Sequence, residues 1–154
     1  MKPRPIRDDD GVHLWVILWR AARAVERVAA DDIAASGLSR TDFAIMEAVM
    51  SKGPLPVNEI AGKALLTSGA MTAAVDRLEK AGMVKRTPSP DDRRVRVVTL
   101  TAQGRRRIRT AFARHRARID ALFETLDRDQ RATLGGLLKN VGYAAQRDGE
   151  RSGS

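Results

Sequence analysis

The sequence contains no cysteine among its 154 residues. A disulfide framework, a cysteine-ligated zinc site, a thiol nucleophile and a cysteine-based peroxide sensor are therefore excluded. The two histidines, His13 and His115, form no recognisable metal-ligand spacing, so we expect neither a metal nor a cofactor. A glycine-rich phosphate loop and a serine–histidine motif are also missing, and Asp91 and Asp92 lie in a turn too exposed to keep a carboxyl group protonated. These absences indicate a protein that is not an enzyme.

Long apolar runs are missing as well. No stretch of 18 consecutive apolar residues occurs, so we expect no segment that crosses a membrane. The N-terminal residues MKPRPIRDDDG contain proline and acids where a secretory signal would need an apolar run. We therefore expect a cytoplasmic protein, and its length predicts one domain or one domain with an extension used for assembly.

Positive charge is in excess and is concentrated in one part of the chain. Lys and Arg number 28 against 19 Asp and Glu, a formal net charge of +9, and 22 of the bases are arginine. Residues 77–118 contain 14 bases and three acids, or +11, so the whole excess lies in this segment. Arginine binds phosphates and base edges through its planar guanidinium, which favours nucleic acid or an anionic membrane as partner. Alternatively, the arginines only keep the surface solvated.

The spacing of apolar residues predicts long helices at both ends of the chain. From Val12 they recur every three or four positions until Ser36 and Gly37, which is typical of an amphipathic helix. Thr101 is expected to cap a second long helix whose heptad seam contains Ile108, Phe112, His115, Ile119, Leu122 and Leu126. A last helix opens at Asp127 or Asp129, although its three glycines, Gly135, Gly136 and Gly142, each destabilise it by about 1 kcal/mol relative to alanine.

The middle of the chain predicts a DNA-binding motif. A helix over residues 41–52 is followed by two more helices between Pro56 and Gly82, with a short break at residues 65–68. Two β-rich runs, Met83–Thr87 and Arg94–Leu100, then flank a proline-bearing turn and indicate a hairpin. Two helices with a tight break and a following hairpin make a winged helix-turn-helix, in which the second helix lies in the major groove.

Candidate DNA-binding residues lie on this second helix and on the hairpin. The free amides at its N-terminus, around Ser68 and Gly69, suit a phosphate, and Arg77 is its only outward residue able to form two bonds with a guanine. Asp92 can hold the guanidinium of Arg94 in one rotamer, which lowers the entropy lost on docking. Arginines on a thin ribbon suit a narrow minor groove. The basic residues of the hairpin are Lys85, Arg86, Arg93, Arg94 and Arg96.

A resemblance to a known family is carried by residues 53–104, GPLPVNEIAGKALLTSGAMTAAVDRLEKAGMVKRTPSPDDRRVRVVTLTAQG. They are similar to the DNA-binding core of the multiple antibiotic resistance regulator (MarR) family of bacterial transcription factors. The specific marks are Val75-Asp76-Arg77-Leu78-Glu79 with Gly82, then Asp92-x-Arg94 followed by Val98-x-Leu100-Thr101-x-x-Gly104. The resemblance implies a homodimer on a pseudopalindromic operator, with the Asp92–Arg94 pair in the minor groove. It also implies that the major-groove face includes Ser68, Gly69, Thr72 and Arg77.

Members of this family often bind small anionic aromatic molecules in a crevice between the dimer helices and the winged lobe. The residues expected to line it here are Trp15, Trp19, Arg23, Phe43 and Met46. Core or dimer packing is the alternative role for the two tryptophans. For His115 the alternatives are a packed histidine and a pH-sensing or ligand-binding one. Arg105 to Arg118 either extend the DNA-facing surface or keep a long helix soluble.

The predicted fold is therefore mainly α with a small β-hairpin wing. A winged helix-turn-helix domain occupies residues 37–104, a helical dimerisation region comprises 11–36 and 105–147, and residues 1–10 and 148–154 are expected to be disordered tails. The expected function is a homodimeric repressor of a nearby gene, which a small-molecule effector releases from double-stranded DNA. The alternatives are a nonspecific architectural or RNA-binding protein, and a protein-interaction module that has lost DNA binding.

Overall fold

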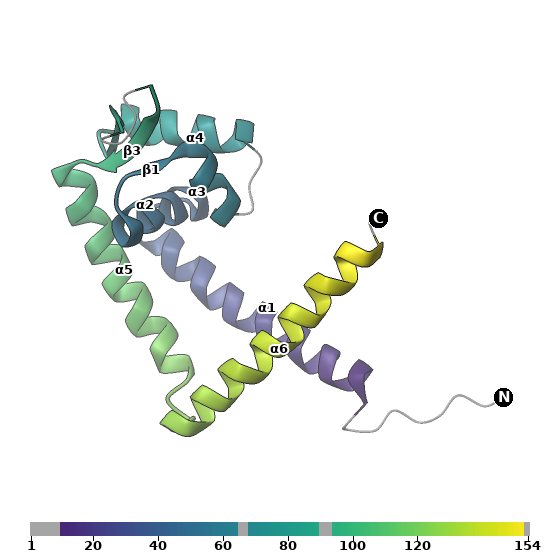
Figure 1. The fold of residues 1–154 in the computed structure, drawn as a ribbon. Coiled ribbons are helices and arrows are strands. Elements are labelled where there is room, and N and C mark those ends of the chain that lie inside the picture. The colour runs from purple at the N-terminus through teal and green to yellow at the C-terminus, as the bar shows by residue number, and fades with distance from the viewer. Residues whose placement is uncertain (1–9, 65–67, 90–93, 153–154) are drawn as a thin grey trace. The chain divides into compact units, whose positions relative to one another are not determined.

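The computed structural model describes residues 10–64, 68–89 and 94–152, without the side chains of 61–64, 68 and 69. Their helices and strands (Figure 1) are α1 (Gly11–Ala35), α2 (Arg40–Lys52), β1 (Leu55–Pro56), α3 (Val57–Ala64), α4 (Ser68–Lys80), β2 (Val84–Pro88), β3 (Arg96–Leu100), α5 (Ala102–Leu122) and α6 (Arg128–Ser152). The chain divides into two compact units, one up to Ile119 and one from Asp120 onwards. The fold class is confirmed as mainly α with a small antiparallel sheet.

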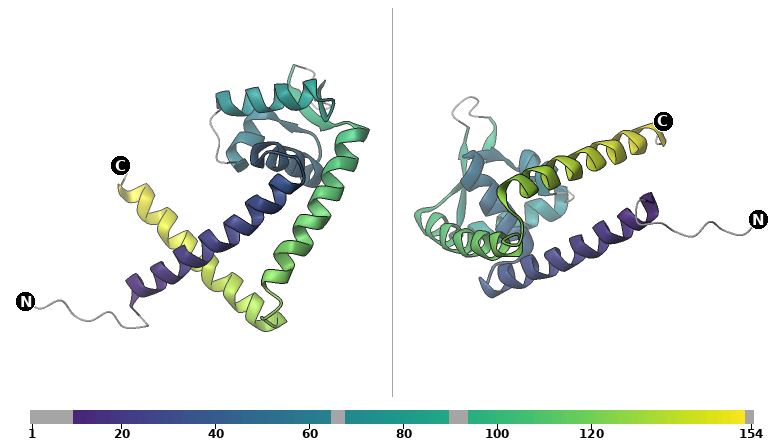
Figure 2. Two further views of the ribbon diagram at one scale, coloured as in Figure 1. Left: turned by 180° about the vertical axis from the view of Figure 1, so that it is seen from behind. Right: turned by 90° about the horizontal axis from the view of Figure 1, so that it is seen from below.

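The core of the first unit lies among α2, α3, α4, the sheet and the start of α5. Ile45, Met46, Ile60, Met71 and Ile108 are completely buried there. The three strands pair antiparallel in the order β1–β3–β2, and the hairpin register joins Val84 to Leu100 and Pro88 to Arg96. We call α2 to α4 together with the sheet the winged lobe. In both views of Figure 2 the C-terminal end of α1 lies against this lobe and its N-terminal half extends away.

The wing and α5 are joined by a tight connection around Thr101. As predicted, the Thr101 hydroxyl caps α5, because its oxygen accepts the Gly104 N–H at 3.0 Å. The same hydroxyl donates to the Gly82 carbonyl at 2.7 Å, and the Thr101 N–H donates to the Met83 carbonyl at 3.0 Å. Gly104 is buried against Met83, where a Cβ would overlap the Met83 carbonyl. The start of α5 is thereby fixed to the wing.

Three details of the fold differ from the sequence prediction. Helix α2 begins at Arg40 rather than at Thr41, and the Ser39 hydroxyl caps it by accepting the Asp42 N–H at 3.0 Å. The strand β1 was not predicted, since two residues carry no periodicity that would reveal it. The helix α6 continues to Ser152, whereas a disordered tail was expected from residue 148. No proline interrupts this end, and Gly149 alone does not stop the helix.

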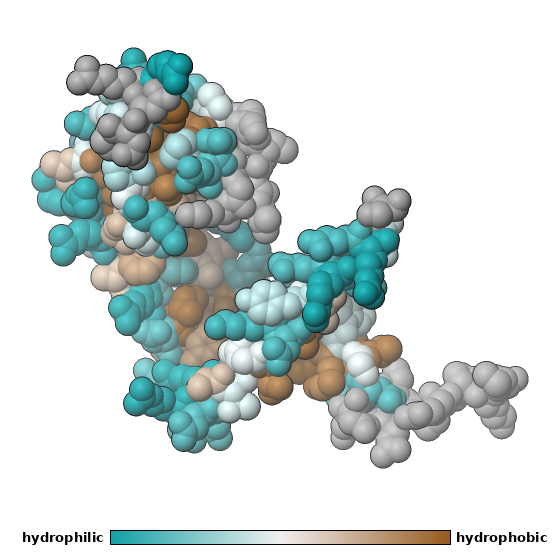
Figure 3. Space-filling view, in the orientation of Figure 1, coloured by the Kyte–Doolittle hydropathy of each residue, from teal (hydrophilic) through white to brown (hydrophobic). Residues whose placement is uncertain are grey.

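Large apolar side chains of α1 and α6 remain on the surface of the single chain. Those in the first half of α1 are between 37% and 62% exposed, and Figure 3 shows apolar atoms there: Val12, Leu14, Trp15, Ile17, Leu18 and Trp19. Those of α6 are between 43% and 60% exposed: Leu137, Leu138, Val141 and Tyr143. Neither helix has a buried residue. Within the described part of the chain, no helix is both long and apolar enough to cross a membrane.

Candidate nucleic-acid interface

The helix α4 presents one face to the core and the opposite face to solvent, as the sequence predicts. Met71, Val75 and Leu78 are buried, and Ala74 joins them at 2% exposed. Thr72, Ala73, Asp76 and Lys80 are exposed on the other side. The helix begins at Ser68, so Ser68 and Gly69 supply its N-terminal amides. We call α4 the recognition helix, because it is the second helix of the helix-turn-helix.

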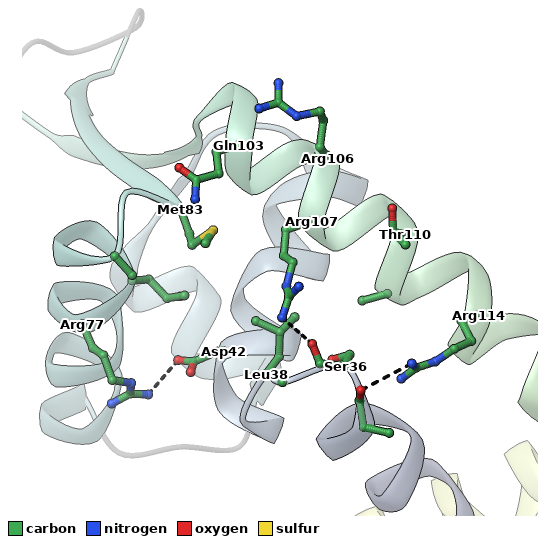
Figure 4. A pocket seen from close by; sticks show the side chains of 15 residues that line it. Ser36, Leu38, Asp42, Arg77, Met83, Gln103, Arg106, Arg107, Thr110 and Arg114 are labelled. Carbon is green, nitrogen blue, oxygen red and sulfur yellow. Dashed lines mark hydrogen bonds and ion pairs between the residues drawn. The ribbon is translucent and has the colours of Figure 1, made fainter.

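Arg77 does not extend freely from the recognition helix. Its guanidinium donates to the Asp42 carboxylate at the start of α2, and the two atoms lie 2.7 Å apart (Figure 4). The Arg77 side chain is 54% exposed, whereas that of Asp42 is only 13% exposed. In the free protein this guanidinium therefore binds a carboxylate, and its contact with a guanine stays a prediction.

Arg86 likewise has intramolecular partners. Its guanidinium donates to Asp76 and to Glu79, each at 2.5 Å, and its backbone N–H donates to Glu79 at 2.9 Å. The backbone and side-chain hydrogen bonds from Arg86 lower the pKa of Glu79 below its ordinary value. Burial lowers the pKa of Arg86, but its hydrogen bonds to Asp76 and Glu79 outweigh this and raise it. Arg86, predicted as a DNA contact, therefore ties the wing to the recognition helix.

The sequence contains a signal for this link that our prediction did not use. Asp76 and Glu79 lie one turn apart on the recognition helix, so their carboxylates repel each other unless a cation lies between them. No comparable signal marks Asp42, because it lies 35 positions before Arg77. Asp42, Asp76 and Glu79 are thus the charged residues of this region whose ion pairs were not predicted from the sequence.

The wing presents several of its predicted bases to solvent. Lys85 on β2 is exposed, and so are Arg94 and Arg96 at the start of the returning strand. Asp92 and Arg93 lie outside the described residues, and so does the predicted contact between Asp92 and Arg94. Lys85, Arg94 and Arg96 are thus the described wing bases that remain as candidates for DNA binding.

Two arginines of α5 bind the C-terminal end of α1. Arg107 donates to the Ser36 carbonyl at 2.5 Å, and Arg114 donates to the Asp32 carboxylate at 3.0 Å and to the Asp32 carbonyl. Cations are stabilised at this end of a helix, because its last carbonyls are unpaired and carry partial negative charge. The two roles predicted for these arginines, extending the DNA-facing surface and keeping the helix soluble, do not account for the contacts of Arg107 and Arg114. They fix α1 to α5.

His115 belongs to the same junction. Its Nδ1 lies 3.2 Å from the Asp32 carboxylate, and its ring packs edge-on against Phe43 with the centroids 5.1 Å apart. The side chain is 17% exposed. These contacts are those of a packed histidine with a polar partner.

A groove of about 750 Å³ lies at this junction, and Arg107 and Arg114 line it. It is bounded by the α1–α2 corner, the C-terminal end of the recognition helix and α5, as Figure 4 shows. Its apolar lining includes Leu38, Leu78, Met83 and Ala111, and its charged lining consists of Asp42, Arg77, Arg106, Arg107 and Arg114. Three of the four arginines already bind oxygens of the protein, Arg77 at Asp42, Arg107 at Ser36 and Arg114 at Asp32. Arg106 is the described lining arginine that offers its donors to an anion.

The five residues predicted for an effector crevice are not brought together within the chain. Phe43 and Met46 are buried in the core of the winged lobe. Trp15 and Trp19 lie on the exposed half of α1, 62% and 48% exposed. Arg23 lies over the Trp19 ring, 5.1 Å from its centroid. The predicted crevice between the dimer helices and the winged lobe stays a prediction, and in the single chain core packing takes Phe43 and Met46.

Comparison with known proteins identifies the family. The model of the MarR family matches residues 38–95. The HTH-type transcriptional regulator MhqR of Bacillus subtilis (strain 168) is 33% identical over 138 residues, covering 90% of this chain and 95% of MhqR. The transcriptional repressor CouR, solved on a 23-mer DNA duplex, is 27% identical with a TM-score of 0.72, covering 90% and 99% of the two chains.

A second CouR structure, from Rhodococcus jostii RHA1 with bound p-coumaroyl-CoA, is 24% identical with a TM-score of 0.74, covering 87% of this chain and 92% of that chain. The similarity to MhqR extends over nearly the full length of both proteins, well beyond the winged lobe that the family model matches. The chain therefore belongs to the MarR family of DNA-binding transcriptional regulators.

Proposed function

We propose that this regulator is a homodimeric repressor that binds a pseudopalindromic operator with one winged lobe on each half-site. The observation that carries the proposal is the combination of an exposed recognition-helix face, exposed wing bases and uncovered apolar faces on α1 and α6. In a helix-turn-helix dimer, the recognition helices enter successive major grooves about 34–36 Å apart. The related CouR is a repressor solved on a DNA duplex, which supports this assignment.

The composition of α1 supports the dimer. In its first half, large apolar side chains point to opposite sides of the helix, for example Trp15 and Ile17, and both are more than half exposed. A helix that is apolar all round is normally buried on all sides. A single chain leaves this one uncovered, and a second copy of the chain would bury it.

Replacing Ile17 by aspartate should convert the dimer to a monomer without unfolding the chain. Ile17 is 51% exposed in the single chain, so the substitution removes no core contact, whereas in a dimer it would bury an unpaired carboxylate. Sedimentation velocity measures the mass, and circular dichroism checks that the helices remain. Arg27→Asp, an exposed position farther along α1, is the control and should stay dimeric. A monomeric wild-type protein, or an unaffected Ile17→Asp dimer, would refute the proposed interface.

We further propose that a small anionic effector binds in the groove and weakens DNA binding. The groove pairs an apolar lining with the exposed Arg106, and Arg77 connects it to the recognition helix. An effector that binds the DNA-free dimer more tightly than the DNA-bound dimer lowers the affinity for the operator. The size of the decrease is set by the ratio of the two effector affinities. The related CouR binds p-coumaroyl-CoA, an aromatic acyl group joined to a phosphate-bearing carrier.

The substitution Arg106→Gln should weaken binding of benzoate, an aromatic carboxylate, by roughly three- to tenfold, the range for one partly exposed charged contact. Isothermal titration calorimetry measures the affinity directly, without DNA. The matched control is Arg109→Gln, an exposed arginine of the same helix that does not line the groove, and it should bind benzoate like the wild type. Equal affinities of the two variants would show that benzoate does not use the groove.

A further inference from the structure

Arg77 is the cation of the recognition helix that is best suited to bind DNA, and it forms an ion pair with Asp42. The only other base in this helix is Lys80, which lacks the planar fork of a guanidinium. Arg77 lies on the flank of the helix and is 54% exposed, so a change of side-chain rotamer is enough to turn it towards a bound duplex. In the free protein its guanidinium lies instead against α2, 2.7 Å from the Asp42 carboxylate (Figure 4).

Asp42 is well placed to keep its position. It lies in the first turn of α2, where the free amides and the helix dipole stabilise a carboxylate. Its backbone N–H is held by the Ser39 hydroxyl at 3.0 Å, and its side chain is only 13% exposed. A carboxylate fixed in this way loses little conformational entropy when it holds an arginine, so the pair is stronger than one between two flexible surface residues.

The same arrangement recurs on the other flank of the recognition helix. There Asp76 and Glu79 bind Arg86 of the wing, each at 2.5 Å. Two guanidiniums that the sequence assigns to DNA are therefore neutralised by three carboxylates of the protein itself. A guanidinium that stays bound to a protein carboxylate does not neutralise a DNA phosphate, so fewer counterions leave the DNA when the protein docks. The sequence-independent part of the binding is therefore reduced.

We propose that Asp42 is a positioning residue that holds Arg77 away from the DNA phosphates and so suppresses sequence-independent DNA binding. This inference rests on the proposed function only in taking α4 as the helix that approaches DNA. Phosphate contacts carry no sequence information, whereas a guanine offers Arg77 two acceptors in one plane. The Asp42 carboxylate competes with any single phosphate for Arg77, and random DNA therefore gains little from this arginine.

The substitution Asp42→Asn tests the proposal. Its affinity for a random duplex should rise by roughly three- to tenfold, because a partly exposed guanidinium becomes available for one phosphate. A plot of log K against log salt concentration should also become steeper by about 0.9, the value for one additional phosphate contact. Both quantities come from fluorescence anisotropy of the full chain with a labelled random duplex at several salt concentrations.

Three further variants separate masking of Arg77 from a general change in charge or stability. Glu47→Gln removes the same charge from α2, where Glu47 accepts from Ser51 and contacts no described base, so its slope should match the wild type. Asp42→Glu keeps a carboxylate and should restore the wild-type slope. In Asp42→Asn/Arg77→Gln the freed guanidinium is gone, and the gain in slope should disappear.

Two results would overturn the inference. An unchanged or weaker affinity of Asp42→Asn would mean that Asp42 orients Arg77 for binding or leaves it unaffected. An equal gain in Asp42→Asn and Glu47→Gln would mean that only net charge matters. Because random duplex is the ligand, these outcomes are independent of whether an operator exists; failure of the proposed function is detected separately, as equal wild-type affinities for operator and random DNA.

Discussion

Replacing Arg94 by alanine is expected to weaken operator binding by roughly one to two orders of magnitude for each half-site, the range for one well-placed arginine. Arg94 is exposed where the wing returns to β3, and the wing is held to the recognition helix by the contacts of Arg86 with Asp76 and Glu79. A narrow minor groove concentrates negative potential, so an arginine inserted there is favoured beyond an ordinary phosphate contact. Fluorescence anisotropy at one salt concentration measures the loss.

The control for this prediction is Arg151→Ala, which removes the same charge from an exposed position near the end of α6. Its operator affinity should remain close to that of the wild type. Both variants should keep the oligomeric state and the thermal unfolding curve of the wild type, because neither residue belongs to the core. An Arg94→Ala protein that binds the operator with unchanged affinity would contradict the assignment of the wing to DNA.

Replacing Gly104 by alanine is expected to lower the free energy of unfolding by about 2 kcal/mol or more, as overpacking of a closed interior site does. A Cβ at this position would overlap the backbone carbonyl of Met83. Because that atom belongs to the main chain, no change of side-chain rotamer removes the overlap, and α5 must move away from the wing. The movement would also disturb the bond from the Gly104 N–H to Thr101, which caps α5.

Urea unfolding followed by circular dichroism measures this effect. The matched control is Gly149→Ala in α6, where a Cβ would meet no atom within 4 Å. Alanine has the higher helix propensity, so the control should be unchanged or more stable by up to about 1 kcal/mol. A Gly104→Ala protein as stable as the wild type would show that the wing and α5 can separate without cost.

The elements that the sequence predicted share a strong local pattern. The heptad seam from Ile108 indicated the long helix α5, which ends at Leu122, before the last predicted seam residue Leu126. The two β-rich runs indicated the hairpin on either side of a proline-bearing turn. Thr101 was recognisable as a cap, because its side chain bonds an amide only three residues away. Each of these features is decided by residues close together in the sequence.

The features that escaped prediction depend on residues far apart in the chain. Arg77 looked available for DNA, since nothing in its surrounding sequence reveals the carboxylate of Asp42, 35 positions earlier. Arg107 and Arg114 appeared to be surface charges, but their partners lie at the end of α1, more than 70 positions away. A helical projection shows which side of a helix faces outward, but a long side chain can still bend towards a partner on a neighbouring helix.

The consequence for function is that the excess of +11 over residues 77–118 overstates the charge offered to DNA. Arg77, Arg86 and Arg114 bind carboxylates within the protein, and Arg107 binds a helix end. The recognition surface therefore depends on the exposed face of α4 and on the wing rather than on the sum of the basic residues. Such a surface suits a protein that distinguishes one DNA sequence from others.

The central claim is that this protein recognises a specific operator. The measurement that tests it most directly is the ratio of affinities of the wild-type protein for the intergenic DNA next to its own gene and for a random duplex of equal length, at one salt concentration. The account predicts a ratio of roughly a thousand or more, the range typical of specific DNA-binding proteins. A ratio near one would contradict it and would favour a nonspecific architectural or RNA-binding protein.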